Sequence, residues 1–287
     1  MTFKTILHAT DFSDASLQAL DQARRLARYH GAQLHVLHVE ILLEARYPAL
    51  AVAAVTSQRE RSEQQLRELL SKAGDDEVIQ VTVKHPRAAV AIAEYAESND
   101  IDLIVVGSHG YSGIDRLLMG SEARRLIRHA TVPVLVVKSH DTAKERTEVP
   151  FHHLLAPVDF SDASLLALRK ADELATRYAG KLSVVHSLDV VAPSHYAHVS
   201  TDTQLPLARQ ALATFVADAT LTTEPDQIIS SATAAMSILE TAESQGSDLI
   251  VIARSNMGGL QRFLVGSTTE RVLNGATCDV LVLPAIS

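Results

Sequence analysis

The sequence predicts an α/β protein with two tandem, open, mostly parallel five-stranded sheets that carry helices on both faces. Three observations support this fold class. Short apolar runs of strand length alternate with longer segments of helical period. One seven-residue phrase occurs twice, beginning at residues 11 and 159. The length of 287 residues is about twice that of a common domain. We therefore expect domains at residues 1–140 and 151–287, joined by a linker at 141–150 within a polar stretch that ends in Pro150.

The repeated phrase indicates a tandem duplication. Asp11–Leu17 and Asp159–Leu165 are identical at all seven positions. Further matches pair Arg28–Gly31 with Arg177–Gly180, and Leu117–Ser121 in pattern with Phe263–Ser267. Each half therefore folds as one copy of the same unit.

Hydrophobic periodicity places the elements of the first copy. Strands are expected at Thr5–Ala9, Gln33–Val39, Val78–Val83, Leu103–Val106 and Pro133–Val137. Helices are expected from an N-cap at Ser13 to near Gly31, over Thr56–Lys72, from Pro86 onward, and over Ser121–His129. The second copy repeats this order, with a shorter second helix around Gln204–Ala217.

Composition narrows the class of protein. With 47% hydrophobic and 21% charged residues, the chain is too apolar for a disordered protein. The longest apolar stretch, Tyr47–Val55, contains Pro48 and is too short to cross a bilayer. The first residues lack the pattern of a secretory signal, so we expect a cytoplasmic protein without membrane contact. The single cysteine, Cys278, excludes an intramolecular disulfide.

Net charge disfavours nucleic acid as a partner. The chain carries 26 Lys and Arg against 34 Asp and Glu, a net charge of −8. Residues 1–146 hold 18 basic and 19 acidic residues, a net of −1, and the remainder hold 8 and 15, a net of −7. A polyanionic ligand would therefore be repelled less by the first half. The 13 histidines form no set with metal-site spacing, so no metal site is expected.

A glycine-rich loop is the clearest candidate site. Four of the 12 glycines, Gly107, Gly110, Gly113 and Gly120, fall in one short stretch. The loop follows a predicted strand and precedes a helix, so it lies at the carboxyl edge of the sheet, where open α/β sheets bind ligands. Gly120 and Ser121 open that helix, and its free N–H groups suit a phosphate. The stretch therefore predicts a phosphate-binding loop.

The spacing Gly107-x2-Gly110-x9-Gly120-Ser121 resembles the nucleotide-binding branch of the universal stress protein family. Asp11 after the first strand and the phrase Thr131–Val137 at the end of the domain add to the resemblance, which covers nearly the whole chain and is closest to tandem members. It implies a Rossmann-like fold of the adenine nucleotide alpha hydrolase type. It also implies binding of ATP, or of AMP or ADP, with Mg²⁺ as counter-ion.

Residue roles follow from that resemblance. It implies that Asp11 binds the adenine edge, with the backbone of Ala9 and Val39 lining the base pocket. Gly107 and Gly110 would flank the ribose and α-phosphate, and Gly120 and Ser121 would hold the outer phosphates. The rest of the loop consists of Ser108, His109, Tyr111, Ser112 and Gly113.

Two structural interpretations stand beside these roles. The glycines also suit a plain turn from strand to helix, and Asp11 also suits a helix cap. In the second copy, Ala253 and Asn256 take the places of Gly107 and Gly110. We therefore expect a weak or absent nucleotide site there, the alternative being a modified site for a smaller adenylate or another ligand.

Three functions remain open. The first is a stress-response binding module, or switch, gated by ATP in the first domain. The second is a nucleotide-independent scaffold with a vestigial site, and the third is a weak ATPase. No nucleophile elbow or His-Glu-x-x-His pattern is present, so at most slow ATP hydrolysis is expected. The family resemblance also implies pairing through the terminal strands Pro133–Val137 and Asp279–Leu283, giving an internal pseudo-dimer and allowing a homodimer.

Overall fold

The computed structural model describes residues 1–41, 48–71, 78–108, 119–138, 148–188, 201–254 and 266–285. Its contacts divide the chain into two compact units, Thr2–Ser139 and His140–Ser287, with Met1 grouped in the second. The predicted glycine-loop residues 109–113 and most of the predicted linker lie outside the described residues. Each unit is an α/β fold with a parallel sheet, so the predicted fold class is confirmed.

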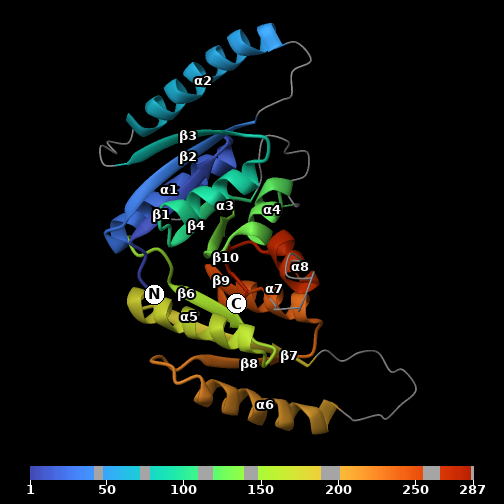
Figure 1. Ribbon diagram of the computed structural model, residues 1–287. Coiled ribbons are helices and arrows are strands. Elements are labelled where there is room, and N and C mark those ends of the chain that lie inside the picture. The colour runs from blue at the N-terminus through green and yellow to red at the C-terminus, as the bar shows by residue number, and fades with distance from the viewer. Residues whose placement is uncertain are drawn as a thin grey trace, which may run out of the picture. The chain divides into compact units, whose positions relative to one another are not determined.

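The first unit alternates strands and helices from end to end (Figure 1). In chain order the elements are β1 (Thr5–Thr10), α1 (Asp14–His30), β2 (Gln33–Ile41), α2 (Pro48–Ser71), β3 (Ile79–His85), α3 (Ala88–Ser98), β4 (Leu103–Gly107), α4 (Ser121–His129) and β5 (Val134–Val137). The strands lie in the order β3-β2-β1-β4-β5 and are all parallel. This order places the change of direction between β1 and β4, where open α/β sheets form ligand sites.

The second unit repeats this arrangement. Its elements are β6 (His153–Pro157), α5 (Asp162–Tyr178), β7 (Lys181–Ser187), α6 (Thr201–Asp218), β8 (Asp226–Ser230), α7 (Ala234–Gln245), β9 (Leu249–Ala253), α8 (Ser267–Gly275) and β10 (Asp279–Leu283). The strand order is β10-β9-β6-β7-β8, again parallel. The duplication seen in the sequence is therefore a duplication of the complete fold.

The central strands are buried on both faces. Consecutive residues of β4 and β5, from Leu103 to Val106 and from Val134 to Val137, are all buried. Because successive side chains of a strand point to opposite faces, both faces of the sheet must be covered by helices. Helices α3 and α4 pack against each other, and α1 packs against β1 and β4 (Figure 1).

The predicted cap of the first helix is present. Ser13 precedes α1, and its hydroxyl accepts from the backbone N–H of Ser16. Gly31 ends the helix in the left-handed region, at φ 63°. Ser161 caps α5 in the same way, but Ala179 takes the left-handed position there, at φ 50°.

Helix α2 begins earlier than predicted. It starts at Pro48, eight residues before the expected start at Thr56. Proline is favourable in the first turn of a helix, where its missing N–H has no partner to lose. The apolar stretch that begins there is therefore the first part of a helix. None of the described helices is long and apolar enough to span a membrane.

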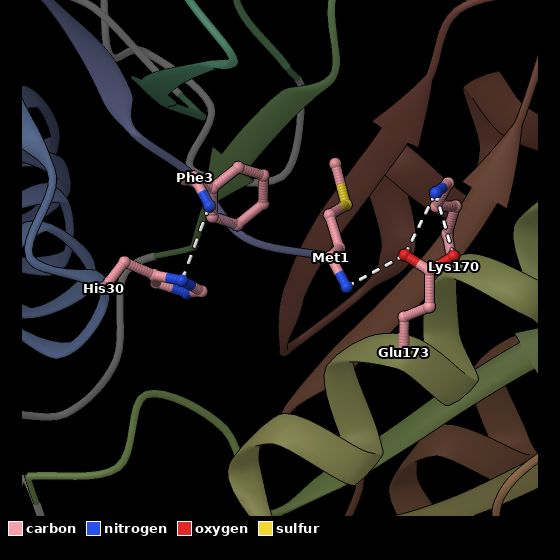
Figure 2. A network of polar contacts seen from close by, with 5 residues as sticks. All are labelled: Met1, Phe3, His30, Lys170 and Glu173. Atoms are coloured by element: carbon pink, nitrogen blue, oxygen red, sulfur yellow. Dashed lines mark hydrogen bonds and ion pairs between the residues drawn. The ribbon is translucent and has the colours of Figure 1, made fainter.

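Polar contacts near the start of the chain hold elements within each unit (Figure 2). In the first unit, the backbone N–H of Phe3 donates to His30 Nδ1 at 3.5 Å. In the second, the Glu173 carboxylate accepts from Lys170 Nζ at 2.9 Å and pairs with the amino group of Met1 at 2.8 Å. Burial opposes ionisation of Glu173, but these two cations lower the pKa of its carboxyl below the usual value.

Candidate functional site

The first unit contains a pocket of about 400 Å³ at the carboxyl ends of its central strands. Its wall is formed by the ends of β1, β2 and β4 and by the first turns of α3 and α4. The lining residues are Ala9, Thr10, Asp11, Ser16, Leu37, His38, Val39, Ile41, Ala88, Ile92, Val106, Gly107, Gly120, Ser121, Glu122, Ala123 and Leu126. The pocket is therefore mostly apolar, with polar groups contributed by the end of β1, the first turn of α1, the end of β2 and the start of α4.

Sequence reasoning placed several residues at this edge, and the structure brings six of them to the pocket wall. They are Ala9, Asp11, Val39, Gly107, Gly120 and Ser121. Ser108 is not among the lining residues. It is buried, with 1% of its surface exposed; its N–H donates to Val137 O and its carbonyl accepts from Gly120 N. Ser108 therefore connects the start of the loop to its end.

Asp11 holds the turn that leads into α1. One carboxylate oxygen, Oδ1, accepts from the backbone N–H of Ser13 at 3.0 Å and from the Ser13 hydroxyl at 2.6 Å. Among the described residues, the second oxygen has no hydrogen-bond partner, and the side chain is exposed at the pocket wall. The geometry thus gives Asp11 a capping role and leaves one oxygen to accept from a ligand.

A buried polar network lies beneath this turn. His8 is completely buried on β1, and its Nδ1 lies 3.1 Å from the carbonyl of Val105. Burial lowers the pKa of His8 to about 4, outweighing that hydrogen bond, so the ring is neutral near pH 7. The Ser16 hydroxyl donates to Thr10 Oγ1 at 2.8 Å, which also accepts from the Phe12 N–H. No local sequence pattern reveals this network, because its members come from β1, β4 and α1.

Phe12 stands in a conformation that favours glycine. Its φ is 66°, in the left-handed region, although phenylalanine carries a bulky side chain. The equivalent Phe160 has φ 64°. Strained residues of this kind concentrate at functional sites, where the surrounding structure holds them in place. In each unit this residue directly follows the aspartate at the pocket wall.

The N-terminus of α4 also lines the first pocket. Gly120 is the N-cap, at φ −58° and ψ 146°, and no side chain caps the helix. Ser121 is exposed there. The first helical N–H groups lack intrahelical acceptors, so this end attracts anions. Gly120 stands in a conformation open to any residue, so its backbone angles do not require glycine.

Glu122 is a pocket residue that sequence reasoning missed. Its Oε2 accepts from the Ala89 N–H at the start of α3 at 3.2 Å, and its Oε1 pairs with Arg125. The carboxylate therefore caps α3 while lying in the wall near the phosphate-binding end proposed from the sequence. Its position immediately after Ser121 is the sequence feature that could have identified Glu122 as a pocket residue.

Gly107 has a structural reason to be glycine. A Cβ at this position would lie 2.7 Å from the backbone oxygen of Ala15, in the first turn of α1. The absent side chain thus allows close packing of α1 on β4. This finding supports the plain structural interpretation for Gly107.

The second unit holds a pocket of about 330 Å³ in the equivalent place. Its lining residues are Pro157, Val158, Asp159, Ser161, Ala163, Ser164, Val185, Ser187, Ala234, Ser237, Ile238, Ile252, Ala253, Gly266, Ser267, Thr268 and Thr269. Ala253 lines this wall, so a Cβ at the Gly107 position leaves a pocket in place. The predicted weakness of this half for nucleotide stays a prediction.

Two parallel α/β units, each with a pocket at the carboxyl edge of its sheet, define a tandem protein of the Rossmann-like class. The model of the universal stress protein family matches residues 2–138 and 150–284. The chain therefore belongs to the universal stress protein family, with two such domains.

Known relatives agree with this assignment. A universal stress protein of Mycolicibacterium smegmatis is 26% identical over 97% of this chain and 96% of its own length. A universal stress protein of Methanocaldococcus jannaschii is 34% identical over 47% of this chain and 82% of its own length. The crystal structure of a universal stress protein from Archaeoglobus fulgidus matches 98% of both chains with a TM-score of 0.69 and 21% identity, which supports the fold.

Proposed function

We propose that the first domain binds an adenine nucleotide, with ATP as the main ligand, and that the chain acts in the cytoplasm as a nucleotide-gated binding module in the stress response. The observation that carries this proposal is one pocket lined both by Asp11 and by the start of α4, a helix whose N-terminus has no side-chain cap. An adenine base carries hydrogen-bond donors, which the Asp11 carboxylate can accept. The phosphate chain carries negative charge, which the N-terminus of a helix attracts.

The walls of this pocket suit a purine ring. Leu37 and Val39 of β2 and Ile92 of α3 are among the residues that line the pocket. Ile41, with 44% of its surface exposed, lies at the rim of the same wall. Flat apolar surfaces of this kind bury an aromatic ligand, while a few polar groups fix its orientation.

Magnesium fits the electrostatics of this site. The Glu122 carboxylate lies in the wall next to Ser121, so a phosphate chain would meet a negative charge there. A divalent cation bound to the phosphates would offset this repulsion, and Glu122 and the Ser121 hydroxyl supply oxygen ligands of the kind that Mg²⁺ prefers. Without the cation, Glu122 should weaken binding.

A variant at Gly120 tests the site. Valine is compatible with the backbone angles of Gly120, so Gly120→Val should fold. Because Gly120 lines the pocket, we expect the added side chain to clash with the phosphate. We expect calorimetric titration with ATP to show a loss of affinity of at least about tenfold, equivalent to about 1.4 kcal/mol. A thermal unfolding profile equal to wild type confirms that the fold is intact. Unchanged ATP affinity in the folded variant would remove Gly120 from the site.

A nucleotide-independent scaffold is the second candidate. Two observations favour it: the packing of Gly107 against Ala15 and the capping role of Asp11 each explain a motif residue without a ligand. A third function, slow ATP hydrolysis, would show as a magnesium-dependent rate that Gly120→Val abolishes. The absence of bound nucleotide after incubation with ATP would favour the scaffold.

We also propose that the two domains pair as an internal pseudo-dimer through their terminal strands and that whole chains dimerise. The sequences of β5 and β10 are almost entirely apolar, and such edge strands favour pairing. Light scattering of the full chain should give twice the monomer mass of 31.0 kDa. A mass equal to the monomer at micromolar concentrations would reject the homodimer.

A further inference from the structure

Strand β3 forms the outer edge of the first sheet. In the strand order β3-β2-β1-β4-β5 it stands at the end, and among the described residues it pairs only with β2. A strand with one neighbour presents a row of backbone N–H and C=O groups on its outer side without a sheet partner. Such a row is a template to which another strand can add. The edge of β3 is therefore a candidate interaction surface.

No residue of β3 is buried. Ile79, Gln80 and Lys84 are exposed, and the other residues of the strand are partly exposed, although α2 and α3 both contact it. By contrast, residues 103–106 of β4, in the middle of the same sheet, are all buried. Successive side chains of a strand point to opposite faces, so Gln80 and Lys84 are exposed on one face and Ile79 on the other. The strand is therefore accessible along its length.

The sequence of β3 carries few of the features that block pairing at an edge. Natural edge strands are protected by proline, by charged side chains, by bulges or by short length. Here the register with β2 is continuous from Ile79 to His85, no proline interrupts it, and Lys84 is the only Lys, Arg, Asp or Glu of the strand. Ile79, Val81 and Val83 alternate and so form one apolar face. An edge of this composition favours pairing.

The outer strand of the second sheet is better protected. β8 runs only from Asp226 to Ser230, and Pro225 precedes it directly. Proline lacks the N–H that a further strand would need, and Asp226 places a carboxylate at the first position of the strand. The two sheets thus differ at their outer edges, although the domains share one fold. Of these two edges, β3 is the one suited to pairing.

A second copy of β3 matches this edge in register. Two copies related by a two-fold axis perpendicular to the sheet meet with their β3 strands antiparallel. Residues directly opposite each other then point to the same face, so the axis must pass beside a residue and not between two. An axis beside Thr82, the middle residue, pairs the whole strand. An axis beside Val81 or Val83 pairs only residues 79–83 or 81–85.

The same register also matches the side chains. Val81 faces Val83 of the second copy, and Thr82 faces Thr82 of the second copy. Pairs of β-branched residues and pairs of threonines stabilise antiparallel strands. Lys84 faces the neutral Gln80 of the second copy, so no like charges oppose each other. The strand is therefore complementary to itself in shape, polarity and charge.

We propose that two copies of the chain pair through β3, antiparallel about Thr82, so that their first sheets join into one continuous sheet. This inference rests on the homodimer put forward under the proposed function and names its surface. It does not depend on ATP binding. Within the first sheet, β3 and β5 lie at opposite edges, so this surface does not compete with the pairing proposed for the terminal strands.

Cysteine cross-linking of the full chain tests both the surface and the register. Thr82→Cys places two thiols opposite each other, with Cα atoms about 4.5–5.5 Å apart, a separation that a disulfide spans. Gln80→Cys, on the same strand and face, is the matched control. Its two copies would lie four residues apart along the paired strands, about 13 Å, which is too far for a disulfide.

The covalent dimer is measured by non-reducing denaturing electrophoresis after incubation with oxidised glutathione. Thr82→Cys should give a covalent dimer as its main product, and Gln80→Cys almost none. Wild type should give none, because its single cysteine, Cys278, is buried. A cross-link of equal yield in Gln80→Cys, or none in Thr82→Cys, would overturn the proposed register and surface.

Light scattering separates the failure of this surface from the failure of the homodimer. Thr82→Asp sets two carboxylates opposite each other, so its mass should fall to that of the monomer, 31.0 kDa, while Thr82→Val should stay dimeric. Thermal unfolding equal to wild type shows that each variant is folded. A folded Thr82→Asp that stays dimeric would overturn β3 as the surface and leave the homodimer standing. A monomeric wild type would reject both.

Discussion

Gly107 lies against the backbone of Ala15 so closely that a Cβ would come within 2.7 Å of the Ala15 carbonyl oxygen. This contact places the first turn of α1, and with it Ser16 at the pocket wall, directly on the end of β4. One glycine of the proposed nucleotide motif therefore contributes to the fold whether or not a ligand is present.

Gly107→Ala should destabilise the protein. The added methyl group must displace the α1 backbone, and overpacking of this kind costs about 1–3 kcal/mol. Denaturant titration measures the change in the free energy of unfolding. Ala253→Gly, the reverse change in the second domain, is the control and should cost no more than about 1 kcal/mol. Equal stability of Gly107→Ala and wild type would show that the α1 contact is readily relaxed.

Asp11→Asn distinguishes the two roles of Asp11. The amide oxygen still accepts from Ser13, so stability should stay within about 0.5 kcal/mol of wild type. Loss of the charge should lower ATP affinity by about tenfold, because the oxygen facing the pocket becomes a weaker acceptor or a donor. Asp159→Asn makes the same change in the second domain and should leave ATP affinity unaltered. If Asp11→Asn binds ATP normally, the residue acts only as a cap.

Glu122→Gln should raise ATP affinity in the absence of Mg²⁺. The amide oxygen keeps an acceptor for the Ala89 N–H, while the negative charge near the phosphates is removed. We expect a gain of about three- to tenfold at low ionic strength, shrinking as salt screens the charge. Glu94→Gln, an exposed residue of α3, serves as the control. A weaker affinity in magnesium-free buffer would place the phosphates away from Glu122.

His8 should make the fold sensitive to mild acid. Its pKa is lowered from 6.5 to about 4 by burial, so the unfolded chain binds a proton more readily than the folded one. This contribution to stability is complete above pH 6.5 and falls by about 3 kcal/mol in total as the pH drops toward 4. His35, whose pKa burial also lowers, adds to the loss in the same direction.

Thermal unfolding across that range tests the contribution of His8. His8→Asn keeps a hydrogen-bond donor for the Val105 carbonyl but does not titrate. Its unfolding temperature should fall less steeply than that of wild type between pH 6.5 and 4. The carboxyl groups of Asp159 and Glu173, whose pKa values are lowered, act at more acidic pH. Parallel curves for the two proteins would show that His8 is protonated without cost to the fold.

Strand positions and the N-cap at Ser13 could be predicted from the sequence. Hydrophobic periodicity and helix capping depend on residues that are close together along the chain. The predicted alignment of Gly31 with Gly180 was wrong by one residue. Ala179 holds the left-handed position, whereas Gly180 is needed because a Cβ would lie 2.9 Å from the His152 carbonyl. The two copies thus use glycine for different reasons, which depend on tertiary packing.

The sheet edge that holds the candidate pocket could be predicted from the sequence for the same reason. The loop between β4 and α4 identified the sheet edge, but Glu122 entered the pocket through its contact with α3, a partner distant in the sequence. The second domain is expected to bind nucleotide weakly or not at all because Ala253 and Asn256 replace two glycines of the loop, and this expectation stays a prediction. The hydroxyl-bearing residues Ser237 and Thr269, which line the second pocket, come from two separate helices, and no short sequence motif connects them.

Nucleotide stoichiometry tests the central proposal most directly. Full-length protein incubated with ATP and Mg²⁺, freed of unbound ligand and then denatured, should release close to one adenine nucleotide per chain by mass analysis. Gly120→Val should release almost none, while Thr269→Val should release as much as wild type. Absence of adenine nucleotide from wild type, or its full retention in Gly120→Val, would contradict ATP binding in the first domain.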